Sequence, residues 1–319
     1  MEKYLLKKAA SSILTFVIIV IILIWIFISM PADYVSALGP SEDVSLKNQI
    51  RHELFLDKPK GEQFRHWVKK VFSGNLGYSF MMGQPVGKII KSTLKKSYKL
   101  YTSSFLAAIL LSIPIGVLSA SKPYSRSDKI FSVLSIVGIC IPPFVLAALF
   151  KLIFINSNNM KLFVFMNKFS SQGYMKYAKL MTGRILPFLV MFLLDMGLMV
   201  KYVKTSMLEI MKENYVKTAR SKGLKERVVL YKHALKNASV TIVTVIGITV
   251  NTVISYGVIT EYCFSFPGIG VLTYSATISR DYPLMMGISI VWVVTLISIN
   301  FLMDIIYCFI DPRIRFSKS

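Results

Sequence analysis

The chain has 319 residues, of which 54 % are hydrophobic and 17 % are charged, and its formal net charge is +22. Much of such a chain would be insoluble unless it were buried in lipid. The excess of basic residues does not indicate a nucleic-acid groove, because exposed aromatic residues are not interleaved with it.

Six apolar runs are candidates for membrane spans: residues 11–30, 100–120, 130–155, 185–200, 239–260 and 284–310. The first, second and fifth runs contain no charge and have about the 20 residues that an apolar helix needs to cross a bilayer. The other three carry one charge each, at Lys151, Asp195 and Asp304. No cleavage site of small residues follows the first run, so we interpret it as a retained anchor.

Prolines interrupt two of these runs. Pro114 lies in the second, and Pro142 and Pro143 lie in the third. Each proline removes one hydrogen bond from a helix, which membrane helices tolerate where neighbours or a cavity satisfy the carbonyls. We therefore expect kinked spans, consistent with a moving pathway or with packing alone.

Basic residues predict how the spans are oriented. If the chain crosses the membrane six times, the tails and loops on one side hold 19 Lys and Arg in 66 residues. The short loops on the other side hold 5 in 51 residues. The positive-inside rule then places both termini in the cytoplasm. The loop after the first span is too long for its charge to control orientation. The predicted parts are a tail and first span (1–30), an extracytoplasmic subdomain (31–99), spans two to four (100–200), cytoplasmic helices (201–238), spans five and six (239–310) and a cytoplasmic tail (311–319).

Several kinds of chemistry have no support in the sequence. The cysteines and histidines show neither CxxC nor metal-ligand spacing: Cys140, Cys263, Cys308, His52, His66 and His233. The nearest match to a phosphate loop is "GQPVGKII", which has three residues instead of four between Gly83 and Gly87 and lacks a hydroxyl after Lys88. We expect no catalytic residue, no metal site and no nucleotide hydrolysis by this chain.

The stretch "YVKTARSKGLKERVVLYKHALKNA", residues 215–238, predicts two amphipathic helices that meet at a corner. Apolar residues at helical spacing precede Gly223, from Leu208 through Tyr215 to Ala219. Gly223 suits the left-handed position that ends a helix, and Leu224 is placed to pack back on the preceding turn. The physics alone leaves two interpretations open: a pair of helices on anionic lipid headgroups, or a knob for another protein.

This stretch resembles the cytoplasmic coupling motif of ABC-importer permeases, in the form of the oligopeptide, dipeptide and nickel class. The match is carried by Thr218, Ala219, Arg220 and Gly223. Other stretches resemble the class in the same order: "YLLKKAASSI", "NLGYSFMMGQPV", "SMLEIMKENYVKTARSKGL", "FSFPGIG", "RDYPLMMG" and "DPRIR". They cover nearly the whole chain, and the long loop after the first span matches the first of two permease subunits.

The resemblance implies an all-α membrane protein with six transmembrane helices, the ABC importer type I permease fold, in the bacterial cytoplasmic membrane. It implies a second permease, two cytoplasmic ATPase subunits that carry ATP and Mg, and an external substrate-binding protein. Departures are "MPADYV", where the class has Gly-Asp-Pro, and Thr241, where it has proline. We expect the fifth span to be less kinked for lack of that proline.

The resemblance assigns coupling to the ATPase to nine consecutive residues: Tyr215, Val216, Lys217, Thr218, Ala219, Arg220, Ser221, Lys222 and Gly223. We predict that the translocation path or its gate includes Asp195, Asn251, Phe264, Phe266, Pro267 and Gly268. A carboxylate inside a span is costly and is a functional candidate by default. Asp195 is expected either to attract the amino group of a peptide or to pair with Lys201.

The leading hypothesis is a permease subunit that forms half of a path for oligopeptides or dipeptides. A nickel ion or metal chelate is the alternative within the same class, although no histidine or cysteine cluster supports a naked metal. An intramembrane enzyme would need Asp195 and Asp304 to face each other. The sequence shows no catalytic motif beside either of them, which argues against this alternative. A passive channel would conduct without any partner.

Overall fold

The computed structural model describes residues 2–30, 35, 45, 48, 51, 52, 55–79, 81–155 and 180–310. The predicted stretches "DPRIR" and most of the loop 156–183 lie outside these residues, as does most of "MPADYV". Regular structure within the described ranges is helical except for one short antiparallel hairpin, formed by β1 (Tyr78–Ser79) and β2 (Gln84–Pro85).

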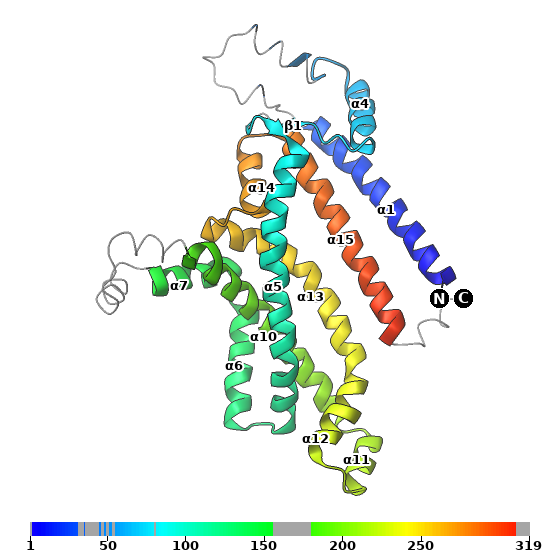
Figure 1. The fold of residues 1–319 in the computed structure, drawn as a ribbon, viewed down its shortest axis with the longest axis vertical. Helices are drawn as coiled ribbons and strands as arrows, with labels where there is room; N and C mark the ends of the chain where they lie inside the picture. The colour runs from blue at the N-terminus through cyan, green and yellow to red at the C-terminus, as the bar shows by residue number, and fades with distance from the viewer. Residues whose placement is uncertain are drawn as a thin grey trace. The chain divides into compact units, whose positions relative to one another are not determined.

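Five helices are long and apolar enough to span a membrane, and there are six spans if one bent pair counts as one (Figure 1). The five are α1 (Glu2–Ser29), α5 (Val86–Ser121), η1 with α10 (Met181–Ile185, Leu186–Ile210), α12 with η2 and α13 (Glu226–Val228, Val229–Ala234, Leu235–Phe264), and α15 (Tyr282–Ile310). The predicted all-α architecture with six spans is confirmed in this sense. The side of the membrane that each terminus occupies stays a prediction.

The helices extend beyond the predicted apolar runs. The predicted boundaries at residues 99, 200 and 238 therefore fall inside helices. Helical hydrogen bonds do not depend on side-chain polarity, and lysines are good helix formers, so α5 begins well before its apolar part. Thr241 lies inside α13 without a break, as expected where no proline interrupts the helix.

The third predicted span is a broken pair instead of one kinked helix. It consists of α6 (Arg126–Cys140) and α7 (Pro143–Ile155), whose axes differ by 113°. Ile141 is extended, with φ −85° and ψ 121°, as expected before a proline. The carbonyl of Pro142 then accepts the first hydrogen bonds of α7, from Val145 and Leu146. Two adjacent prolines, which donate no N–H, explain why the predicted kink is a full break.

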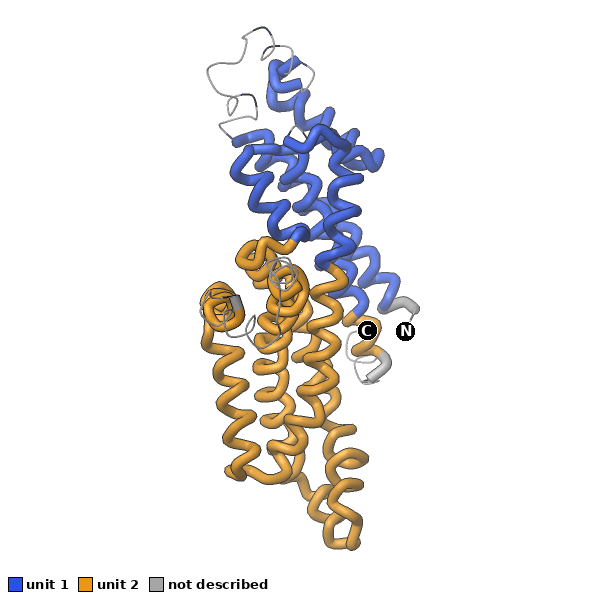
Figure 2. Tube along the Cα trace, turned by 60° about the vertical axis from the view of Figure 1, so that its left-hand side comes forward, with its two compact units in different colours: residues 1–97, 267–302 blue, residues 98–266, 303–319 orange. Residues whose placement is uncertain are grey.

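The chain forms two compact units, shown in Figure 2. Unit 1 comprises residues 1–97 and 267–302. In it α4 (Lys60–Phe72) packs through Trp67 and Val71 against α1 and α15. A second cluster joins the start of α5 to α15 and to the short helix α14 (Ile269–Ile278). The backbone N–H of Ile269 donates to the buried hydroxyl of Ser97, which fixes the start of α14 on α5.

Unit 2 comprises residues 98–266 and 303–319 and is built around α10. One face of α10 packs with the end of α5 and with η2 and α13, through Val117, Val203, Met207 and Ala234. Other buried residues of α10 meet α7 and the end of α13. The helix α11 (Asn214–Ser221) follows α10, so the most buried helix of this unit leads directly into the predicted coupling segment.

Candidate functional site

The glycine corner consists of α11, the turn at Gly223 and α12 (Figure 1). It begins where α10 ends at Ile210. Turn hydrogen bonds join Lys212 N–H to the carbonyl of Glu209 at 3.1 Å and Glu213 N–H to that of Ile210 at 3.1 Å. This turn separates α10 from α11, so the single helix predicted from Leu208 onward is two helices.

Gly223 has φ +73°, as predicted for the residue that ends α11. Its N–H donates to the carbonyl of Arg220 at 2.9 Å, and the N–H of Leu224 donates to that of Ala219 at 3.4 Å. These two bonds form a Schellman motif, which favours glycine because other residues resist the left-handed conformation. The side chain of Leu224 is 41 % exposed, so the expected packing against the preceding turn contributes little.

A small apolar seam holds the glycine corner together. It consists of Val216, Ala219 and Val229, with Ile210 packed against them. The predicted stripe placed Tyr215 on this face, but Tyr215 is 42 % exposed and Val216 is fully buried. The turn after Ile210 resets the helical phase by a residue, which the spacing of apolar residues did not reveal. The seam ties α11 to the helix that begins at Glu226.

The outward side of the corner is polar and mostly basic. Lys217, Thr218, Arg220, Ser221 and Lys222 are exposed. The two hydroxyl groups donate back to carbonyls of α11, at 3.0 Å for Thr218 and 3.1 Å for Ser221. The hydroxyl groups are therefore already used within α11, and the lysine ammonium groups are the main polar groups that this surface presents to a partner.

Arg220 and Glu226 join the two arms of the corner. Two hydrogen bonds of 2.7 and 3.2 Å connect the guanidinium to the carboxylate. The hydrogen bond to Glu226 raises the pKa of Arg220 further above its already high ordinary value. The second arm was predicted as a short helix ending at residue 238, but it continues without interruption from Glu226 to Phe264 as the fifth span. The corner is thus attached directly to a long helix.

Asp195 lies inside unit 2 and is 1 % exposed. The hydroxyl of Tyr256, on α13, donates to its Oδ1. Its Oδ2 has no hydrogen-bond partner among the described residues. The alternative pairing with Lys201 is wrong, because the Lys201 side chain is exposed. Asn251 is half-buried, and its amide donates at 3.1 Å to the carbonyl of Gly247 on its own helix.

The predicted gate loop begins with a buried aromatic residue. Phe264 packs with Leu146 and Val190, and Lys151 Nζ lies 5.6 Å from its ring centroid. Phe266 is buried, Pro267 is exposed and Gly268 is buried. Ser265, with φ +52°, takes the left-handed position at the end of α13. Pro267 and Gly268 belong to unit 1, whereas Asp195, Asn251, Phe264 and Phe266 belong to unit 2.

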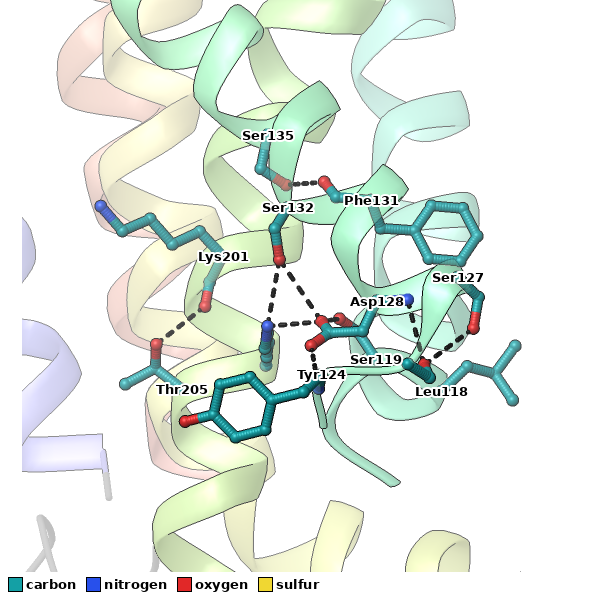
Figure 3. A network of polar contacts seen from close by, with 12 residues as sticks. Leu118, Ser119, Tyr124, Ser127, Asp128, Phe131, Ser132, Ser135, Lys201 and Thr205 are labelled. Atoms are coloured by element: carbon teal, nitrogen blue, oxygen red, sulfur yellow. Dashed lines mark hydrogen bonds and ion pairs between the residues drawn. The ribbon is translucent and has the colours of Figure 1, made fainter. Parts of the chain in front are cut away.

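Two buried aspartates form clusters that the sequence analysis missed. Asp128, in the first turn of α6, binds Lys204 of α10 and Ser119 of α5 (Figure 3). The spacing of Ser125 and Asp128 is that of a capping box, and the Asp128 N–H does donate to Ser125 Oγ. That motif predicts a helix start but gives no sign of the lysine 76 positions later.

The second cluster is the hairpin junction, formed by the β1–β2 hairpin and Asp281. Asp281 is fully buried. Its Oδ2 accepts from the hydroxyl of Ser79 at 2.6 Å and from Met81 N–H at 3.1 Å, and its Oδ1 accepts from Leu284 N–H at 3.2 Å. Asp281 therefore caps α15 and holds the hairpin on it. Across the described ranges, no group of three metal-ligating side chains comes together.

Two family models together match nearly the whole chain. Residues 112–316 match the family described as binding-protein-dependent transport system inner membrane component, and residues 1–101 match its N-terminal family. The chain is 30 % identical to the oligopeptide transport system permease protein AppB of Bacillus subtilis, over 99 % of this chain and 100 % of that one. It is 32 % identical to a putative peptide transport system permease protein of Brucella abortus, with the same shares.

A solved structure has the same fold. The inward-facing MetNI methionine ABC transporter contains a chain that superposes with a TM-score of 0.54 at 15 % identity. The superposition covers 70 % of this chain and 96 % of the other.

Proposed function

The chain belongs to the binding-protein-dependent transport system inner membrane component family, and on that premise we propose that it forms half of a peptide path and is driven through the glycine corner. It is a permease subunit of an ABC importer and a multi-pass protein of the bacterial inner membrane. ATPase and substrate-binding partners follow from that class.

The observation that carries the coupling proposal is the construction of the glycine corner. Its polar residues face outward, while its apolar residues form a closed seam. One arm follows the most buried helix of unit 2, and the other is continuous with the fifth span. A stiff element transmits displacement, whereas a flexible loop absorbs it. A groove on an ATPase subunit that receives the corner would therefore move two spans at once.

We assign the energy source to the partners. In this proposal, ATP and Mg bind to the two ATPase subunits and not to this chain. ATP closes the ATPase pair, and the closed pair binds one arrangement of the spans more tightly than the other. ATP binding therefore favours that arrangement. The charge distribution of the sequence supports a cytoplasmic position for the corner and both termini.

We propose an oligopeptide or dipeptide as the substrate and a second, homologous permease as the other half of the path. The names of relatives that match this chain from end to end support the substrate class. Within the described residues, one carboxylate oxygen of Asp195 accepts no hydrogen bond, as a group that attracts an amino terminus would need. Because Asp195 is buried here, we infer that a rearrangement of the spans brings it to the path during transport.

Isolation from the native cell tests this proposal. The tagged chain is extracted in mild detergent, and mass spectrometry identifies its companions. We expect a second permease with one or two ATPase subunits. The purified complex, reconstituted with its binding protein, should accumulate labelled oligopeptides only when ATP is present. A chain that is stable alone and conducts ions by itself would contradict the proposal in favour of a channel. Uptake of nickel but not of peptides would overturn the substrate assignment.

A further inference from the structure

An ion pair between a buried carboxylate and a half-buried ammonium joins three helices of unit 2, close to the end of α10. Asp128 is 4 % exposed, and the ammonium of Lys204 binds its Oδ1. Ser119 donates to the same oxygen, and Tyr124 N–H donates to Oδ2 at 2.8 Å. Figure 3 shows Asp128 among these groups, with Ser132 above it. Lys204 Nζ also lies 3.1 Å from the hydroxyl of Ser132.

The ion pair is an expensive way to hold helices together. Burying a carboxylate and half-burying an ammonium costs both ions part of their hydration, and apolar residues of similar volume often stabilise a fold as well or better. The surrounding cluster is apolar and already packs α5 on α10. Stability alone therefore gives a weak reason for the pair, whereas a fixed register between helices gives a better one.

Close packing beside Lys204 restricts the sliding of α5 along α10. A Cβ added to Gly116 of α5 would lie 2.6 Å from the side chain of Val203 and 3.3 Å from the backbone nitrogen of Lys204. Val203 and Met207 of α10 also pack with Leu230 of η2. The close approach to Gly116, the ion pair and the packing against Leu230 all involve the last three turns of α10, just before α11.

We propose that Lys204 and Asp128 are positioning residues for coupling: they fix the end of α10, which leads into α11, to the first turn of α6. This inference rests on the proposed function of the glycine corner. A displacement of α11 then carries α5 and α6 with α10 as one body. Without the tie, the end of α10 shifts against α6 and part of the displacement is lost.

The test measures the number of peptides imported per ATP hydrolysed. The complete complex is reconstituted in proteoliposomes with its binding protein, and a defined mixture of labelled oligopeptides is the probe. We expect Lys204→Met to lower this ratio by about fivefold or more, the lower end of ordinary coupling energies. Lys204→Arg preserves the charge, and because Lys204 makes neither a bidentate nor a stacked contact, this variant should lower the ratio less than Lys204→Met does. A purely structural role would lower the amount of complex and leave the ratio unchanged.

Lys201→Met is the matched control. Lys201 lies on the same helix, and its labelled side chain in Figure 3 points away from Asp128. Its exposed side chain makes no ion pair among the described residues. The same substitution there should leave the ratio at its wild-type value. An equal fall in both variants would overturn the proposal, because the loss would not depend on the pair.

A double variant covers the case in which Lys204→Met fails to assemble with an unpaired aspartate. Asp128→Asn with Lys204→Met leaves no buried charge uncompensated, so it should assemble. A low ratio in the double variant supports the positioning role, and a wild-type ratio overturns it. A wild-type complex that hydrolyses ATP without importing any peptide would instead refute the proposed function.

Discussion

The glycine corner and the hairpin junction are both short turns beside long helices, but they are held together in opposite ways. At the junction, the fully buried Asp281 accepts hydrogen bonds from Ser79, Met81 and Leu284. At the corner, the polar groups lie outside, and the turn depends on the left-handed Gly223 and a small apolar seam.

The contrast supports our proposal that the corner, and not the junction, binds a partner. A polar group that is satisfied internally is not available to another protein, and the junction uses its own polar groups in this way. The corner leaves Lys217 and Lys222 exposed on a frame that does not need them. Exposed charges on a stiff frame suit an interface with an oppositely charged groove.

Asp281→Ala should give the largest effect and would break the junction. It leaves the hydroxyl of Ser79 and two backbone N–H groups without their acceptor, at a cost of about 3 kcal/mol in the free energy of unfolding. A thermal-shift assay on the detergent-purified chain measures the loss. Asp281→Asn keeps one acceptor oxygen and should lose less. Equal melting temperatures for wild type and Asp281→Ala would contradict this account of the junction.

Gly223→Val should give the next largest effect and would break the corner. A β-branched residue resists φ +73° by about 1 to 2 kcal/mol, so the turn should open while the spans still insert. We expect peptide uptake in whole cells to fall by about tenfold, as 1.4 kcal/mol implies, with normal amounts of protein in the membrane. Gly223→Asn, which tolerates the left-handed region, is the milder control. Undiminished uptake by Gly223→Val would count against the corner as a lever.

Asp195→Asn sharpens the comparison with a third buried carboxylate. Unlike Asp281, Asp195 accepts from one donor, Tyr256, and its second oxygen has no hydrogen-bond partner in the part of the chain that the structure describes. We expect a severalfold loss of uptake for peptides with a free amino terminus and a smaller loss for peptides with a blocked one. Competition assays with matched acetylated and free peptides measure both. Equal losses would give Asp195 a structural role only.

Glu226→Gln should give the smallest effect. Glu226 and Arg220 are both exposed, and an exposed ion pair contributes about 0.2 to 1 kcal/mol. Uptake should change by less than about threefold at physiological salt, because solvent ions screen the pair. A loss as large as that of Gly223→Val would mean that the ion pair, and not the backbone turn, holds the corner.

The sequence predicted what depends on local composition. Long apolar runs indicated the spans, and a glycine between two amphipathic segments indicated the corner. The phase of α11 was missed because no proline or glycine marks the turn before it. Two adjacent prolines marked the third span but did not reveal the size of its bend.

Partners distant in the chain were not predictable from spacing. Lys201, six positions from Asp195, was one of the two partners considered for it, whereas the donor to Asp195 in the structure is Tyr256, 61 positions away. Asp128 and Lys204 likewise meet only through the packing of α6 on α10. Tertiary contacts choose among polar groups that a pattern of residue types cannot distinguish.

The most direct test of the account is photocrosslinking from both turns in living cells. A photoreactive amino acid replaces exposed Ser221 at the corner in one strain and exposed Met82 at the junction in another. We predict an adduct with the ATPase subunit from residue 221 and none from residue 82. An adduct from residue 82 instead, or equal adducts from both, would contradict the assignment of the glycine corner as the site of coupling.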